Sequence, residues 1–496
     1  MATAVSALSR VTLPTAKPES DVRTTVTGFF LIGGALCALC LIVPILYALI
    51  VAIPILVVWF WRAPVRGVYV LTAGAALIEI FPLNFPDSLT DRIPLFLNLN
   101  NSAGIPFPIT PAEILIITVG LVAFARGASE GTLRWPGGRL VAAYTLYLLV
   151  VLGAEIHGLA GGGDFKTSLW EIRPQVYGFI LFFMATTLVE NRAQIVRLAI
   201  VFLLAVSVKA VIGDFRYFIT LHGVLSHEDV LAHEDSYFLG MFVIAALAST
   251  IWLKNRRLQV LLGVMSALAL VAMLANYRRA GVYALAAAAG VIVLLAFRFE
   301  PSMRKRIGWI AVALVVAGVF FIASAWDKQY GVQAQLVRPI RSLVDPSARD
   351  LSSDQYRVAE TANLQLTFRT SPIVGVGFGS PFLIVYPMAD ISRLYSLWNV
   401  IPHNSLMWVG MRMGAIGFAA FWALIGLAVL EGCQVLATKR DPVTRTLAAF
   451  AIAAVVGEII VGYADLQLDV YRNLIFLGVV LGVLNRLSSL PEAEVA

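Results

Sequence analysis

The stretch that decides the fold is WDKQYGVQAQLVRPIRSLVDPSARDLSSDQYRVAETANLQLTFRTSPIVGVGFGSPFLIVYPMADISRLYSLWNVIPHN, residues 326–404. It is long and polar in an otherwise apolar chain. A long loop of this kind is usually functional or a linker. An amphipathic helix over residues 352–368 and a glycine turn over residues 375–379 favour a structured cap above a site near one face of a membrane. Its basic residues are Lys328, Arg338, Arg341, Arg349, Arg357, Arg369 and Arg393.

The composition outside this stretch is typical of a membrane protein. Hydrophobic residues make up 59% of the chain and charged residues 14%, and the mean hydropathy is +0.84. These values lie far from those of soluble domains. Cys37, Cys40 and Cys433 all fall in apolar runs, so neither a disulfide framework nor a zinc site is expected. The net charge of +7 arises from basic residues in short loops, which indicates membrane topology rather than nucleic-acid binding.

The apolar runs predict an all-α polytopic membrane protein with about 12 to 14 transmembrane helices, each about 20 residues long. Arginine and lysine concentrate in the loops on one side, and the positive-inside rule makes that side cytoplasmic. Both termini are then cytoplasmic and the long loop is external. The predicted organisation is a cytoplasmic tail (1–25), a helical bundle (26–326), a structured external loop (327–401), C-terminal membrane helices (402–488) and a second tail (489–496).

His403 is the candidate catalytic residue. It follows Pro402 and precedes Asn404 and Ser405, at the start of an apolar helix. One interpretation is a simple helix start, at which Asn and Ser satisfy free backbone N–H groups. The other is a general base at the external boundary of the membrane, because imidazole titrates near neutral pH.

Two groups of arginines are candidate anion ligands. Arg278 and Arg279 form a turn between apolar helices on the external side, against the inside bias, and the arginine fork suits phosphate oxygens. The alternative is contact with lipid headgroups. Arg173 lies at the external start of another helix, where it could converge on the same place or pair with Glu171.

Other polar motifs predict less specific chemistry. His227-Glu-Asp229 and His233-Glu-Asp235 contain metal-ligand types, although a solvated acidic loop explains them as well. The Gly375–Gly379 turn lacks the context of a nucleotide-binding loop, but Gly375 and Gly377 could offer backbone N–H groups to an anion. The external loops contain no Asp-x-Asp pair, which argues against a metal-dependent sugar-nucleotide site.

Three stretches resemble the O-antigen ligase and Wzy-type polysaccharide polymerase superfamily. They are the Arg278-Arg279-Ala280-Gly281 turn, the segment from Arg357 through Pro372 to Gly379, and His403-Asn404-Ser405-Leu406 followed by Gly414-Ala-Ile-Gly417. The order of the motifs and the helical layout match as well. Two positions depart from the family pattern: Arg278 replaces a serine, and Arg412 stands where glutamate is common.

The resemblance implies a membrane glycosyltransferase of the GT-C type. It would transfer a glycan from a polyprenyl (undecaprenyl) diphosphate carrier to a lipid or glycan acceptor, on the external side of the bacterial inner membrane. His403 would accept the proton of the acceptor hydroxyl, and Arg279, with Arg278, Arg173 and Arg357, would stabilise the leaving diphosphate. Such a site needs no metal or other cofactor. A polytopic transporter and a non-catalytic assembly scaffold are the alternatives.

Arg412 carries one further expectation. A charge inside a membrane helix should face the bundle interior and have a partner. Arg412 lies nine positions into the helix that starts at His403, and Glu458 lies seven positions before the external end of the next helix, which places both at a similar depth. A buried Arg412–Glu458 ion pair is therefore predicted. The alternative is that Arg412 binds substrate phosphate.

Overall fold

The computed structural model of the chain describes residues 45–80, 90–100, 108–133, 135–223, 230–328, 332–393 and 395–490, together with Leu83 and a few positions between 27 and 38. Residues 1–25 and 491–496 of the predicted tails lie outside the described residues. So do most of the first predicted membrane helix and the His227–Asp229 motif.

Every regular element within these ranges is a helix. The first half contains α3 (Ile45–Arg62), α4 (Val65–Leu77), η1 (Thr90–Arg92), α6 (Pro111–Ser129), α7 (Arg139–Ala160), α8 (Phe165–Leu188), α9 (Arg192–Phe215), η2 (Arg216–Thr220) and α10 (Asp235–Trp252). The second half contains α11 (Arg256–Ala275), α12 (Arg279–Phe299), η3 (Pro301–Met303), α13 (Arg304–Ala325), α14 (Val332–Val344), α15 (Ala348–Thr370), α16 (Ser405–Thr438), α17 (Pro442–Ala464), η4 (Gln467–Asp469) and α18 (Tyr471–Ser489).

Among the described residues, 8 helices are long and apolar enough to cross a membrane. They are α6, α7, α9 with η2, α10, α11, α12, α16 and α17, and shorter apolar stretches lie in α3, α4 and α13. The predicted class, an all-α polytopic membrane protein, is confirmed. The protein is a multi-pass membrane protein.

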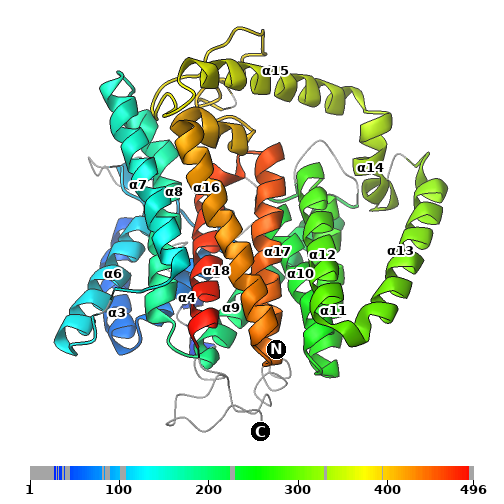
Figure 1. The fold of residues 1–496 in the computed structure, drawn as a ribbon, viewed down its shortest axis with the longest axis horizontal. Coiled ribbons are helices and arrows are strands. Elements are labelled where there is room, and N and C mark those ends of the chain that lie inside the picture. Colours follow the sequence, from blue (N-terminus) through cyan, green and yellow to red (C-terminus); the bar gives the residue numbers. More distant parts are fainter. Residues whose placement is uncertain are drawn as a thin grey trace.

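The centre of the bundle is α18, whose side chains are almost all buried. It crosses α8 where two glycines meet: a Cβ added to Gly478 would lie 2.1 Å from the carbonyl oxygen of Gly178. Small residues allow such close backbone contact between membrane helices. Around this pair, α16 packs on α7 and α17, and α17 packs on α12 (Figure 1).

A group of paired charges is buried in the bundle at the level where α10 and α18 begin. The Lys209 ammonium contacts the Glu79 carboxylate and lies 3.3 Å from Oδ2 of Asp235. Nη2 of Arg472 lies 2.5 Å from Oδ1 of the same aspartate, and its Nε donates to the carbonyl of Ala75 (2.7 Å). Because buried charges are tolerated only when paired, these contacts tie α4, α9, α10 and α18 together.

The polar stretch is structured, as predicted. The amphipathic helix expected over residues 352–368 is α15, which lies across one end of the bundle, and α14 joins it to α13 (Figure 1). The Ser347 side chain caps α15 by accepting from the backbone N–H of Asp350 (3.2 Å). On the other helix of the cap, Arg338 of α14 reaches back to Asp350 (2.6 Å).

The segment predicted as one helix over residues 402–432 is kinked. In α16, Gly414 has φ 62° and ψ −163°, a conformation open almost only to glycine. The Gly375–Gly379 turn docks on this kink: Val376 donates to the carbonyl of Met411 (2.9 Å), and Ala415 donates to that of Pro372 (2.8 Å). The first turns of α16 therefore belong to the cap region, and the remainder crosses the bundle.

Candidate active site

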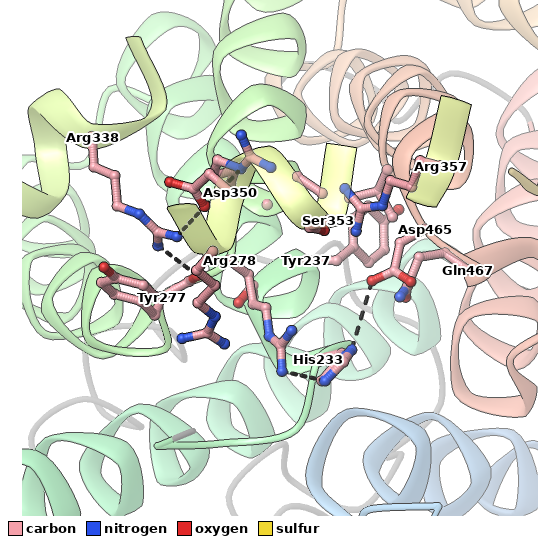
Figure 2. A pocket seen from close by; sticks show the side chains of 16 residues that line it. His233, Tyr237, Tyr277, Arg278, Arg338, Asp350, Ser353, Arg357, Asp465 and Gln467 are labelled. Carbon is pink, nitrogen blue, oxygen red and sulfur yellow. Dashed lines mark hydrogen bonds and ion pairs between the residues drawn. The ribbon is translucent and has the colours of Figure 1, made fainter. Parts of the chain in front are cut away.

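Several helix ends converge beneath α15. The starts of α10 and α12, the end of α17 and the inner face of α15 enclose a pocket of about 90 Å³ (Figure 2). Its lining is polar and rich in arginine. The lining residues are His233, Ser236, Tyr237, Tyr277, Arg278, Arg279, Ala280, Gly281, Arg338, Arg349, Asp350, Ser353, Arg357, Val461, Asp465 and Gln467. We call this space the arginine pocket.

The turn before α12 holds the cap in place. Tyr277 has a positive φ of 60°, which is rare for a residue with a side chain. The Arg338 guanidinium lies over its ring, 3.3 Å from the centroid, and donates to its carbonyl (3.1 Å). Burial opposes ionisation of Asp350, but the hydrogen bond and charge of Arg338, together with the charge of Arg279, hold the pKa of that carboxyl below its usual value.

Arg279 forms a bidentate ion pair with the carboxylate of Asp354 on α15. Nη1 and Nη2 donate to the two oxygens of Asp354 at 3.2 and 2.6 Å, and Nη1 also donates to Ser342 (3.2 Å). The Arg279 side chain is largely buried, whereas that of Asp354 is 44% exposed. This two-pronged contact is the geometry predicted for phosphate, with a carboxylate in the phosphate position.

Arg349 and Arg357 leave their guanidinium donors available to a ligand. Within the described part of the chain, neither guanidinium group makes a hydrogen bond or ion pair, and that of Arg349 lies 5.5 Å from the centroid of the Tyr277 ring. Arg357 lies on the side of the pocket that holds Asp465 and Gln467 (Figure 2). Arg278 contacts the imidazole of His233 through Nη2. The pocket therefore combines fixed and available cations.

Asp465 lies at the end of α17, opposite His233. Nδ1 of His233 is 3.7 Å from Oδ2 of Asp465. Burial alone would raise the pKa of the Asp465 carboxyl, but its hydrogen bond with His233 and its electrostatic interactions with His233, His403 and Arg357 hold the pKa well below its usual value. This carboxylate balances part of the positive charge of the pocket.

His403 is oriented by the carboxylate of Glu360, which is not among the predicted site residues. Its Nδ1 lies 3.1 Å from Oε1 of Glu360, and its backbone N–H donates to Oε2 of the same residue (2.9 Å). Glu360 is completely buried, and the His403 side chain is 26% exposed. With the proton on Nδ1 donated to Glu360, Nε2 is left to accept a proton.

Glu360 and Arg357 are three positions apart on α15, so one face of that helix carries both. The Tyr356 ring packs edge-on against the His403 imidazole, with centroids 5.6 Å apart. Burial, and then the charges of Glu360 and Asp390, raise the pKa of the Tyr356 hydroxyl. The helical spacing of Asp350, Ser353, Arg357 and Glu360 is the sequence signal that could have identified Glu360.

The predicted Arg412–Glu458 ion pair is wrong. The Arg412 side chain is completely buried, and its Nε lies 2.6 Å from Oε1 of Glu171 on α8. Its other nitrogens donate to the carbonyls of Gly377 (3.0 Å) and Val400 (2.9 Å). The kink at Gly414 turns Arg412 toward α8, and Glu458 instead accepts from Asn473 (3.1 Å). With all three nitrogens directed at protein atoms, Arg412 supports the cap and is not oriented toward substrate.

The backbone N–H groups of Gly375 and Gly377 in the docked turn have partners within the protein. The N–H of Gly375 donates to the carbonyl of Ser371 (2.9 Å), and that of Gly377 donates to the carbonyl of Arg412 (3.0 Å). A Cβ on Gly377 would lie 2.3 Å from Gly158 of α7. These glycines permit close backbone packing, and the N–H groups predicted to bind an anion are engaged with carbonyl oxygens of the protein.

Arg173 and Asn404 also have local partners. Arg173 donates to the carbonyl of Pro108 (2.7 Å), and its Nε lies 3.5 Å from Glu113, so neither Glu171 nor the arginine pocket is its partner. Asn404 caps α16 by accepting from the N–H of Met407 (3.0 Å), as the simpler interpretation of this residue predicted. No group of three His, Cys, Asp or Glu side chains among the described residues is arranged to hold a metal ion.

Residues 264–422 match the family model described as O-Antigen ligase. The matched region contains the Arg278–Arg279 turn, the cap, the glycine turn and His403, which are the stretches on which the resemblance rests. The predicted resemblance is therefore confirmed over this part of the chain. A comparison with curated protein sequences gives no match.

Proposed function

Since residues 264–422 carry an O-antigen ligase domain in a multi-pass membrane protein, we propose that the protein is a membrane glycosyltransferase of cell-surface polysaccharide assembly. It transfers a glycan from a polyprenyl diphosphate to an acceptor hydroxyl, as a ligase or as a polymerase. The observation that carries the proposal is the His403–Glu360 pair beside the arginine pocket.

In the proposed step, the acceptor oxygen attacks the anomeric carbon of the donor sugar. The bond between that carbon and the phosphate oxygen breaks, and its electron pair leaves with the polyprenyl diphosphate. The acceptor proton passes to Nε2 of His403, while Glu360 holds the imidazole through Nδ1. Charge thus develops at the leaving diphosphate and at the imidazole, and each lies near a group of opposite sign.

The arginines supply the positive charge that the leaving diphosphate needs. Arg357 and Arg349 offer donors that no described residue occupies, and Arg279 exchanges Asp354 for a phosphate oxygen. Fixed cations directed at developing negative charge are a large source of catalysis. Because arginine performs this task, the proposed step uses no metal. The pocket faces the external side of the cytoplasmic membrane in this proposal.

The test is glycan transfer in a strain in which the gene is deleted and replaced by variants. His403→Ala should lower transfer by about 10²- to 10⁴-fold, as loss of a general base does, with protein in the membrane at the wild-type level. The matched control is His157→Ala, at an exposed position near the end of α7.

Chemical analysis of the surface glycan distinguishes the two activities. Unligated long chains on the lipid carrier in the deletion strain identify a ligase, and single repeat units identify a polymerase. If His403→Ala and an Arg279 variant both retain transfer, the protein is a scaffold rather than the enzyme.

A further inference from the structure

A second and larger cavity of about 620 Å³ lies on the other side of the His233–Asp465 contact. This volume is within the range of small-molecule sites. The start of α8, the segment before α6, the loop before α16 and η4 enclose it. Its described lining residues are Ile80, Asn98, Asn100, Pro108, Lys166, Thr167, Leu169, Trp170, Arg173, Glu234, Tyr395, Ser396, Leu397, Ile401, Leu466, Asp469, Val470 and Tyr471. We call it the aromatic cavity.

The two cavities share a wall. Glu234 and Leu466 line the aromatic cavity, and the residues directly before them, His233 and Asp465, line the arginine pocket. Ile401, also in the lining, precedes His403 by two positions. The catalytic candidate therefore stands close to both spaces.

The charges of the two cavities differ. Five arginines and two aspartates line the arginine pocket, whereas Lys166 and Arg173 are balanced by Glu234 and Asp469 in the aromatic cavity. An excess of positive charge suits a diphosphate. A formally neutral lining with hydrogen-bonding groups suits an uncharged polar ligand.

Aromatic rings form one side of the aromatic cavity. Tyr471 packs against Trp170 (centroids 6.4 Å apart), Tyr177 (5.4 Å) and Phe96 (6.4 Å). This packing holds Tyr471 and Trp170 in place beside the cavity. Rigid amphipathic rings offer a flat face to the C–H side of a sugar ring while polar neighbours bind its hydroxyl groups.

Two carboxyl or amide oxygens of the described lining lack hydrogen-bond partners. Oδ1 of Asp469 and Oδ1 of Asn100 are buried and make no hydrogen bond within the described part of the chain. Asp469 as a whole is only 8% exposed. Buried polar atoms without partners are rare and costly, so they point to a missing ligand. Sugar hydroxyl groups would donate to both oxygens.

We propose that the aromatic cavity binds the glycan of the acceptor, and this inference rests on the proposed function. Displacement at the anomeric carbon with inversion requires the attacking oxygen and the leaving phosphate to lie on opposite faces of the donor sugar. With the diphosphate held in the arginine pocket, the acceptor hydroxyl enters from the opposite side, past His403. The aromatic cavity lies across the shared wall from the arginine pocket and is lined by Ile401, two positions before His403.

The binding experiment uses oligosaccharides released by mild acid from the deletion strain. This pool contains the glycan of the surface glycolipid and the units carried on lipid diphosphate, so it includes the acceptor of a ligase and that of a polymerase. The oligosaccharides are separated by size and labelled with a fluorophore at the reducing end. Binding to the full-length protein in lipid nanodiscs is measured by fluorescence anisotropy.

We expect one size fraction to bind the wild-type protein, and Trp170→Ala and Asp469→Asn each to weaken binding by about tenfold or more. Trp309→Ala, the same change at an exposed position of α13, should bind like the wild type. Arg357→Ala should also leave oligosaccharide binding unchanged. Thermal unfolding of each nanodisc sample checks that the variants are folded.

The inference is overturned if no fraction binds, if both cavity variants bind like the wild type, or if only Arg357→Ala loses binding. The last result would place the sugar in the arginine pocket. The proposed function fails by a separate observation, namely transfer that persists in His403→Ala. Oligosaccharide binding does not depend on His403, so the two failures are distinguishable.

Discussion

Glu360 positions His403 through two contacts, one to the imidazole and one to the backbone N–H, from a completely buried site. The second contact fixes the start of the segment that leads into α16, and the first sets which ring nitrogen is free. A glutamine at this position cannot keep both, because one of its two terminal groups is a donor rather than an acceptor.

Glu360→Gln should therefore lower kcat for transfer by about 10- to 100-fold, the usual cost of losing a group that orients an active-site imidazole. The KM for the lipid-linked donor should not change, and Glu360→Asp should recover part of the rate. Combined with His403→Ala, the glutamine variant should cause no further loss, since the two residues act as a unit. If the losses of the two single variants multiply in the double variant, Glu360 acts independently of His403 and has only a structural role.

The two guanidinium nitrogens of Arg279 that donate to Asp354 are the donors that we propose for the phosphate of the substrate. Arg279→Lys keeps the charge but cannot hold two oxygens at once, so the donor KM should rise by about tenfold or more. Asp354→Asn removes a half-exposed competitor and should lower the donor KM with little effect on thermal stability.

Arg278→Lys is the neighbouring control, because Arg278 contacts His233 rather than Asp354, and its effect on transfer should be milder. Equal KM values for wild type and Arg279→Lys would assign Arg279 to headgroup contact or to holding α15.

At the scale of elements, the arrangement of the site depends on the kink in α16. The cap reaches the bundle because the glycine turn docks where α16 bends and Arg412 crosses to Glu171 on α8. A straight helix would point Arg412 elsewhere and would leave the turn without its backbone partners. This junction holds both ends of the loop between α15 and His403. The glycine turn docks on α16 at one end, and Arg412 donates to the carbonyl of Val400 at the other.

Gly414→Ala should sharply reduce the amount of folded protein. The added Cβ would lie 2.3 Å from the carbonyl oxygen of Ile373 and 2.5 Å from the N of Gly375, in a backbone conformation that already costs about 1–3 kcal/mol for other residues. Size-exclusion chromatography of a fluorescent fusion in detergent measures the folded fraction.

Gly426→Ala, on the same helix with no atom within 4 Å of the added Cβ, should elute like the wild type. A normal profile for both variants would mean that the kink is not needed for folding.

At the scale of the whole molecule, the packing of the helices gathers charged residues in two places, one inside the apolar bundle and one at its end. The Lys209–Asp235–Arg472 cluster joins helices inside the bundle, and the arginine pocket lies at the end covered by α15. The cap and the pocket are on the same end of the bundle, so the orientation of the cap in the membrane decides which side the site faces.

The distribution of arginine and lysine in the short loops predicts that this end is external. A reporter fused after Ala496 should be active in the cytoplasm, and one inserted between α14 and α15 near Ser347 should be active outside. Alkaline phosphatase and fluorescent-protein fusions measure the two sides. Reporters found on the same side would contradict the predicted topology and the external placement of the site.

The membrane class, the helical cap and the grouping of Arg278, Arg279 and Arg357 could be predicted from sequence. Each depends on local pattern: apolar runs set membrane helices, helical spacing sets α15, and short motifs carry the family resemblance that the match to residues 264–422 confirms. The capping of α16 by Asn404 is equally local.

Only the tertiary structure decided the partners of buried polar groups. Arg412 and Glu171 are 241 positions apart, and His403 and Glu360 are 43 apart, so no local pattern pairs them. The backbone of α16 leaves helical geometry at Gly414, two positions after Arg412, and in this kinked helix Arg412 contacts Glu171 rather than Glu458. The N–H groups of Gly375 and Gly377 were likewise taken by carbonyl groups that the kink presents. Burial strongly favours a partner for such groups, but the docking of distant helices determines which one each group finds.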